Sequence, residues 1–130
     1  MNKDKFELTD AVLVSHILNE CGKITNLISR ISFEELEADV IYQDALTREL
    51  EIIGEAAGNL SPDFVKRFPE IPVRDMRAMR NVLAHQYFRV DMEYLWETAV
   101  NDIPPLFEKL ERIKDKLCLT ATSAREDQRL

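Results

Sequence analysis

The chain has 130 residues, of which 45% are hydrophobic and 32% are charged, with only three glycines and five prolines. This length allows one domain with a buried core and is too short for two, and the composition excludes a largely disordered chain and favours an all-α fold. The net charge of −7 excludes a protein coated in basic surface for nucleic acid, although residues 64–90 hold six basic side chains against two acidic ones.

The first half of the chain predicts two long helices joined by a short one. Apolar residues recur with a helical period over residues 8–31 and again over residues 40–60. Between them, Ser32 and Glu35 have the spacing of a capping box, so we expect a short helix or turn to begin there. Gly54 lies inside the second long helix, where glycine costs about 1 kcal/mol relative to alanine, and we expect it to permit close helix packing.

The segment after residue 60 predicts shorter helices separated by prolines. Ser61 and Pro62 have the residue types of an N-cap and a first helical position. Pro69 ends this short helix, and Pro72 is well placed to open a third main helix that runs to about His85.

A fourth helix is predicted from Asp91, which can serve as its N-cap. Pro104 and Pro105 must kink or restart this helix, with Asn101 or Asp102 as the new cap, and the apolar pattern then continues to about residue 117.

The helices together predict an up-and-down bundle of four to five helices formed by residues 1–118. Residues 119–130 have no apolar period, and we expect them to form a flexible tail. We find no run of apolar residues long enough for a membrane span and no apolar signal core in MNKDKFELTD, so a cytoplasmic protein is expected. Cys21 and Cys118 lack metal-binding spacing and are interpreted as reduced thiols, and His16 as a packing or surface residue.

The stretch RNVLAHQYF, which begins at Arg80, places polar side chains in the final turns of the third main helix. At about 100° per residue, Arg77, Asn81 and His85 form one stripe and Arg80 flanks it. The buried face predicted opposite this stripe consists of Met76, Met79, Val82 and Leu83. Arg80 and His85 are about 140° and about 7.5 Å of rise apart, so an unwound helix end or a second copy of the chain is needed to bring them together.

An arginine and a histidine brought together in this way suit cleavage of an RNA phosphodiester without metal. Histidine, with an ordinary pKa of about 6.5, can take a proton from the 2′-hydroxyl or give one to the leaving 5′-oxygen. Arginine matches two phosphate oxygens and stays charged. Asn81 could orient the imidazole or bind a phosphate oxygen. From spacing alone, however, a solvated surface is the more common explanation of such residues.

The stretch RNVLAHQY resembles the R-x4-H-x-Y motif of the HepT toxins, the former DUF86 group, in the HEPN superfamily. The blocks SFEEL, LEIIGEAAGNLSP, FPEIPVRDMRAMRNVLAHQYFRVD and LWETAVNDIPPL are similar to that family in order and spacing, and the resemblance covers residues 8–117. It implies a homodimeric HEPN bundle that acts as a metal-independent endoribonuclease toxin, with no cofactor.

The resemblance also implies roles for single residues. Arg80 and His85 match the catalytic pair, and Asn81 matches the polar residue that usually follows the arginine. HepT toxins are neutralised by MntA antitoxins, minimal nucleotidyltransferases that transfer AMP to the motif tyrosine, which here is Tyr87. Glu55 matches a recurrent family position.

Glu55 shares a helix face with Arg48 and Glu51. This face is either a polar seam that orients Arg80 or Arg77, or a solvated stripe.

Two other functions stay open. A non-catalytic partner or scaffold of a nucleotidyltransferase fits the acidic net charge better, whereas the intact motif fits the enzyme better. A small nucleotide-binding helical protein would use the same basic stripe without cleavage.

Overall fold

The computed structural model describes residues 9–85 and 91–129, with side chains described through Leu117 except for that of His85. Within these ranges all regular structure is helical, as the sequence predicts. The helices are α1 (Asp10–Arg30), α2 (Phe33–Ala38), α3 (Val40–Gly58), α4 (Pro62–Arg67), α5 (Val73–His85), α6 (Met92–Glu97), the π-helical turn η2 (Thr98–Asp102) and α7 (Ile103–Arg129).

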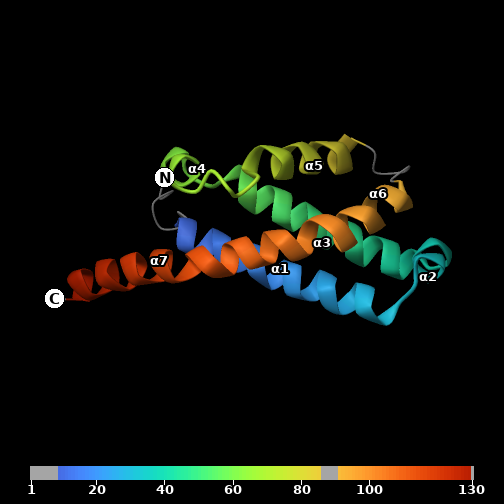
Figure 1. Cartoon of the computed structure of the whole chain (residues 1–130), viewed down its shortest axis with the longest axis horizontal. Coiled ribbons are helices and arrows are strands. Elements are labelled where there is room, and N and C mark those ends of the chain that lie inside the picture. Colours follow the sequence, from blue (N-terminus) through green and yellow to red (C-terminus); the bar gives the residue numbers. More distant parts are fainter. Residues whose placement is uncertain (1–8, 86–90, 130) are drawn as a thin grey trace, which may run out of the picture.

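The long helices lie lengthwise beside one another in an up-and-down arrangement (Figure 1). α3 packs against α1 on one side and against α5 on the other, and α7 packs along α1. The short helices α2 and α4 lie at opposite ends of α3, where they turn the chain back. The motif helix α5 therefore runs antiparallel to α3 at one side of the bundle.

Side-chain caps begin the helices where the sequence predicts them. The Ser32 hydroxyl accepts from the Glu35 amide at 3.1 Å and the Glu35 carboxylate accepts from the Ser32 amide at 3.0 Å, which confirms the capping box. Ser61 caps α4 with Pro62 in its first turn, and Asp91 caps α6. Such caps satisfy amides that have no partner within the helix.

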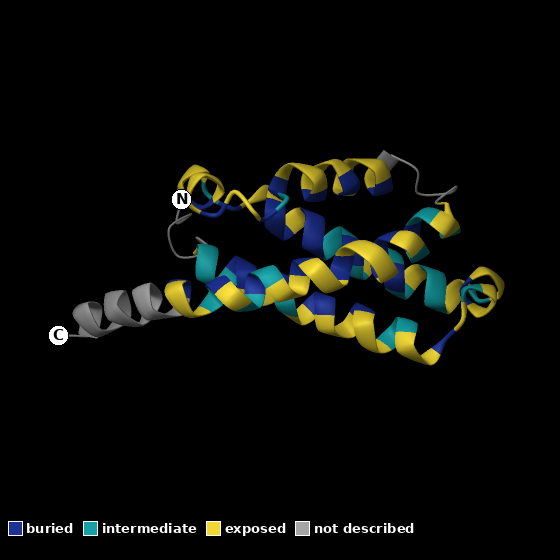
Figure 2. Cartoon of the chain, in the orientation of Figure 1, coloured by how far each residue is buried: buried dark blue, intermediate teal, exposed yellow. Residues whose placement is uncertain are grey.

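The core lies between α1, α3 and α7, and exposed residues cover the outer surfaces (Figure 2). Each large side chain buried there stabilises the fold by about 1.5–3 kcal/mol. On α5, Met76, Met79 and Leu83 are buried as predicted, but Val82 is 39% exposed. The prediction for Val82 was wrong because α5 packs mainly on α3, and a helix with one main neighbour buries only a narrow stripe.

The passage from α6 to α7 also differs from the prediction. Asn101 and Asp102 do not cap a new helix, because the backbone stays helical through η2 and the Ile103 amide donates to the Thr98 carbonyl five residues earlier. This wide turn precedes Pro104 and Pro105, which have no amide hydrogen to donate.

α7 extends to Arg129, beyond its predicted end near residue 117. The added stretch contains no glycine or proline and includes several good helix formers. The flexibility of residues 119–130 stays a prediction. Among the described residues, no helix combines the length and apolar character that crossing a membrane requires.

Candidate active site on helix α5

Helix α5 is held unusually close to α3 at Gly54. A Cβ atom added to Gly54 would overlap the Arg80 Cβ and would lie 3.1 Å from both the Arg80 Cα and the Met76 carbonyl oxygen. The predicted packing role of Gly54 is thereby confirmed. This contact fixes the position of Arg80 along the axis of α3, so the backbone that carries the motif arginine has a defined place.

The Arg80 side chain reaches from α5 to Glu55 on α3. Its Nη2 atom lies 3.4 Å from the Glu55 Oε1 atom, and the two side chains are 48% and 57% exposed. Exposed pairs of this kind contribute only about 0–1 kcal/mol to stability. The contact therefore limits the directions in which the guanidinium points while leaving it open to a ligand. It agrees with the first of the two interpretations of this face, and the orienting role of Glu55 stays a prediction.

The other polar residues of α5 have different surroundings. Arg77 donates from Nη2 to the Leu60 carbonyl at 3.5 Å, which is a long and weak contact, whereas the Glu55 carboxylate accepts from Arg80. Asn81 is exposed on α5. His85 is the last residue of α5, and its side chain and Tyr87 lie outside the described part of the chain.

A hollow of about 400 Å³ lies beside this ion pair between α1 and α3. It brings His16 and Arg48 to the same surface as Glu55. The sequence placed Arg48 on the face of Glu55 but gave no signal that His16, on another helix, would join them. Cys21 is a fully buried free thiol, in agreement with its interpretation as a reduced cysteine, and burial followed by the charge of Glu20 raises the pKa of this thiol to about 12.

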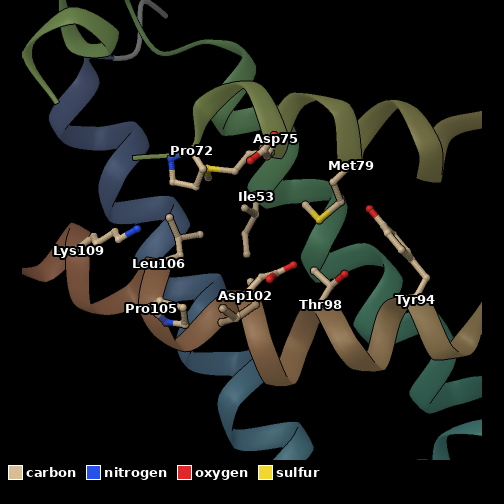
Figure 3. Close-up of a pocket in the computed structure, with 12 residues that line it drawn as sticks. Ile53, Pro72, Asp75, Met79, Tyr94, Thr98, Asp102, Pro105, Leu106 and Lys109 are labelled. Carbon is tan, nitrogen blue, oxygen red and sulfur yellow. The ribbon is translucent and has the colours of Figure 1, made fainter. Parts of the chain in front are cut away.

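A second cavity, of about 350 Å³, lies along α5 between this helix and the segment from α6 to α7 (Figure 3). Figure 3 shows Tyr94, Thr98 and Asp102 on the segment opposite Asp75 and Met79 of α5. Burial, followed by the charge of Asp102, raises the pKa of Tyr94. Sequence reasoning missed this cavity, because it depends on η2 and on how α5 leans on α3.

No group of three or more histidine, cysteine, aspartate or glutamate side chains that could hold a metal ion occurs among the residues whose positions are described. The Arg80 guanidinium and the Glu55 carboxylate form the contact that the structure shows at this surface. A guanidinium can bind a phosphate ester, and a neighbouring carboxylate can orient the guanidinium.

The motif segment and the helices around it fall within a stretch that matches a known family. The family model described as "Ribonuclease HepT-like" matches residues 17–113. The chain belongs to this family. Glu55, Arg80, His85 and Tyr87 all lie within the matched region of this HepT-like protein.

Curated relatives agree with the family match. The HepT-like chain is 45% identical to the "Probable ribonuclease HepT" of Thermococcus cleftensis over 91 residues, which cover 70% of this chain and 83% of that protein. It is 37% identical to the "Putative RNase TTE0752" of Caldanaerobacter subterraneus subsp. tengcongensis over 103 residues, which cover 79% of this chain and 92% of that protein. No solved structure gives a significant match. The resemblance seen in the sequence is confirmed, and family membership supports a ribonuclease function.

Proposed function

We propose that this HepT-like protein is a metal-independent endoribonuclease toxin that cleaves RNA with Arg80 and His85. The observation that carries the proposal is the placement of Arg80, whose half-exposed guanidinium is oriented by Glu55 inside the region that matches the ribonuclease family. A planar, permanently charged group in this position suits the nonbridging oxygens of a phosphodiester.

The reaction is an internal transesterification. The 2′-oxygen of RNA attacks the neighbouring phosphorus, the bond from phosphorus to the 5′-oxygen breaks, and the products are a 2′,3′-cyclic phosphate and a 5′-hydroxyl. One imidazole takes the 2′-hydroxyl proton, and an imidazolium supplies the proton that the 5′-oxygen gains. Arg80 stabilises the negative charge that grows on the nonbridging oxygens.

A homodimer supplies both histidine roles at once. Arg80 and His85 are separated by about 140° around α5 and by about 7.5 Å along it, so one helix does not stack them. Two copies of α5 facing across a two-fold axis bring two arginines and two histidines to one cleft. In this arrangement Arg77 and Asn81 lie along the stripe that ends at His85, where they can bind further phosphate oxygens.

Neutralisation occurs by AMP transfer to Tyr87 by an MntA-like minimal nucleotidyltransferase. The tyrosine oxygen attacks the α-phosphorus of ATP, and pyrophosphate leaves. The product places a negative phosphodiester and a nucleoside two residues from His85. An anion of this size repels the RNA phosphate and obstructs its approach.

The decisive experiment is incubation of the unmodified protein with labelled RNA in EDTA, beside the Arg80→Ala and His85→Ala variants. We expect cleavage to 2′,3′-cyclic phosphate ends by the wild type alone. A folded His85→Ala variant that cleaves at the wild-type rate would contradict the catalytic role proposed for His85.

The net charge of −7 favours one alternative, a non-catalytic partner that docks a nucleotidyltransferase and serves as its substrate. This alternative predicts AMP addition to Tyr87 without RNA cleavage. Incubation with the cognate nucleotidyltransferase, ATP and Mg²⁺, followed by intact-mass analysis of the wild type and of Tyr87→Phe, tests the acceptor. A wild-type protein with bare Tyr87 that cleaves no RNA would favour the docking partner over the enzyme.

A further inference from the structure

The hollow between α1 and α3 has the construction of a small ligand site. Its volume of about 400 Å³ is within the range of small-molecule sites. Its lining combines apolar side chains with a polar rim, namely Leu13, Ile52 and Ala56 with His16, Arg48, Glu55 and Asn59. Leu13 and Ala56 are buried, so an apolar surface lies below polar groups on two helices.

The hollow adjoins the motif, because Glu55 both lines it and contacts Arg80 at 3.4 Å. Helix register gives only the level of the hollow along α5, because Arg48 lies about 120° around α3 from Gly54. Arg48 precedes Gly54 by six residues, about 9 Å along α3, and His85 follows Arg80 by five residues, about 7.5 Å along α5. Since the two helices are antiparallel and Gly54 meets Arg80, the Arg48 backbone lies level with the end of α5.

The rim offers hydrogen-bond donors that the fold does not use. Arg48 is exposed and forms no ion pair or hydrogen bond with any residue that the structure describes, although Glu51 and Glu55 lie on its helix face. His16 is likewise exposed and has no such contact with described residues. The Glu55 carboxylate is directed to Arg80 instead, which leaves the Arg48 guanidinium available to an anion.

We propose that this hollow binds an RNA nucleotide flanking the one that is cleaved. The inference rests on the proposed ribonuclease function and adds a substrate-binding site to it. Arg48 binds the phosphate of that nucleotide, the apolar floor contacts its base or ribose, and His16 and Asn59 provide polar groups at the edge. A local site of this kind also explains how a protein of net charge −7 retains RNA.

The test uses a single-stranded RNA with 2′-O-methyl groups, which lacks the attacking hydroxyl, and measures its affinity by fluorescence anisotropy over a series of salt concentrations. Arg48→Gln removes the charge and keeps much of the side-chain length. Arg112→Gln is the matched control, because Arg112 is exposed on α7 and, among the described residues, donates a hydrogen bond to the Glu108 carbonyl of its own helix.

We expect Arg48→Gln to weaken binding by about tenfold, the size of one lost charge-assisted hydrogen bond. The slope of log affinity against log salt should fall by about 0.7, the value for one phosphate contact of a single strand. Arg48→Lys should retain the slope with lower affinity, and His16→Ala should weaken binding less.

Equal affinity and slope for the Arg48→Gln and Arg112→Gln proteins would overturn the proposal. So would a change of oligomeric state in Arg48→Gln, measured by sedimentation, that accounts for the loss of binding. If the wild type binds and cleaves RNA while Arg48→Gln is normal, only this site fails. If the wild type neither binds nor cleaves RNA, the proposed function fails with it.

Discussion

At the scale of single residues, the contact between Glu55 and Arg80 restrains the guanidinium that we propose to bind the RNA phosphate. We predict that Glu55→Gln lowers RNA cleavage by about tenfold, because an unrestrained arginine must lose rotamer freedom when it binds. The free energy of unfolding should change by less than about 0.5 kcal/mol, since the pair is exposed. Cleavage rates and urea unfolding measure the two effects.

Glu51→Gln is the control for this prediction, because Glu51 lies one turn away on the same face of α3. In an Arg80→Ala background, Glu55→Gln should have no further effect on the affinity for the 2′-O-methyl RNA, whereas a merely structural role of Glu55 would lower that affinity in both backgrounds. A Glu55→Gln protein that cleaves faster than the wild type would show that Glu55 competes with the substrate for Arg80.

Gly54 is a second residue whose effect the structure determines. We predict that Gly54→Ala destabilises the protein by about 1–3 kcal/mol, because the added Cβ overlaps the Arg80 Cβ and forces α5 away from α3. Gly22→Ala in α1 should instead stabilise it by about 0.5–1 kcal/mol, since nothing lies within 4 Å of the added atom. Equal effects of the two substitutions in urea unfolding would contradict the close packing.

At the scale of elements, the interface between α1 and α3 contains two acidic groups without full hydrogen bonding. The Oε1 atoms of Glu20 and Glu49 are buried, and in the described structure neither has a hydrogen-bond partner. Burial, and then the charge of Glu20, raises the pKa of Glu49, while Lys23 opposes this shift. Lys23 lies 3.3 Å from the other oxygen of Glu20.

A raised carboxyl pKa makes the native state bind a proton more tightly than the unfolded chain does. Stability from this group is therefore present below the ordinary pKa of 4.5 and is lost as the pH rises through the raised value. We predict that Glu49→Gln is more stable than the wild type at pH 7 and that the difference shrinks below pH 4.5. Urea unfolding at both pH values checks this, and a difference independent of pH would contradict it.

The elements also show how far sequence reasoning reaches. Caps such as Ser32 and Asp91 depend on residues three positions apart or fewer, so the sequence predicts these helix starts correctly. Val82 and the turn η2 depend on which helices cover them, and periodicity carries no information about that. Residues that share one helix face, such as Arg48 and Glu55 on α3, can be predicted from spacing, whereas the hollow that His16 and Arg48 both line depends on how α1 packs on α3 and could not.

At the scale of the whole molecule, the proposed catalytic centre requires two chains. We predict that mixing the Arg80→Ala and His85→Ala proteins, after brief unfolding and refolding together, restores cleavage above that of either protein alone. In a mixed dimer, one chain retains Arg80 and the other retains His85, so the shared cleft holds one arginine and one histidine. That histidine can serve as base or as acid while water takes the other role, so the restored rate should stay below that of the wild type. Each homodimer in the mixture lacks one of them completely.

RNA cleavage in EDTA is measured for each variant alone and for the mixture, and sedimentation determines whether the proteins are dimers. A mixture of Arg80→Ala with the double variant Arg80→Ala, His85→Ala is the control, because no pairing of these chains supplies an arginine at position 80. If dimers form and the first mixture stays as inactive as this control, either cleavage needs both histidines of the dimer or the catalytic pair belongs to a single chain. In a single chain, unwinding of the end of α5 would have to bring His85 to Arg80, since an intact helix leaves them about 140° apart.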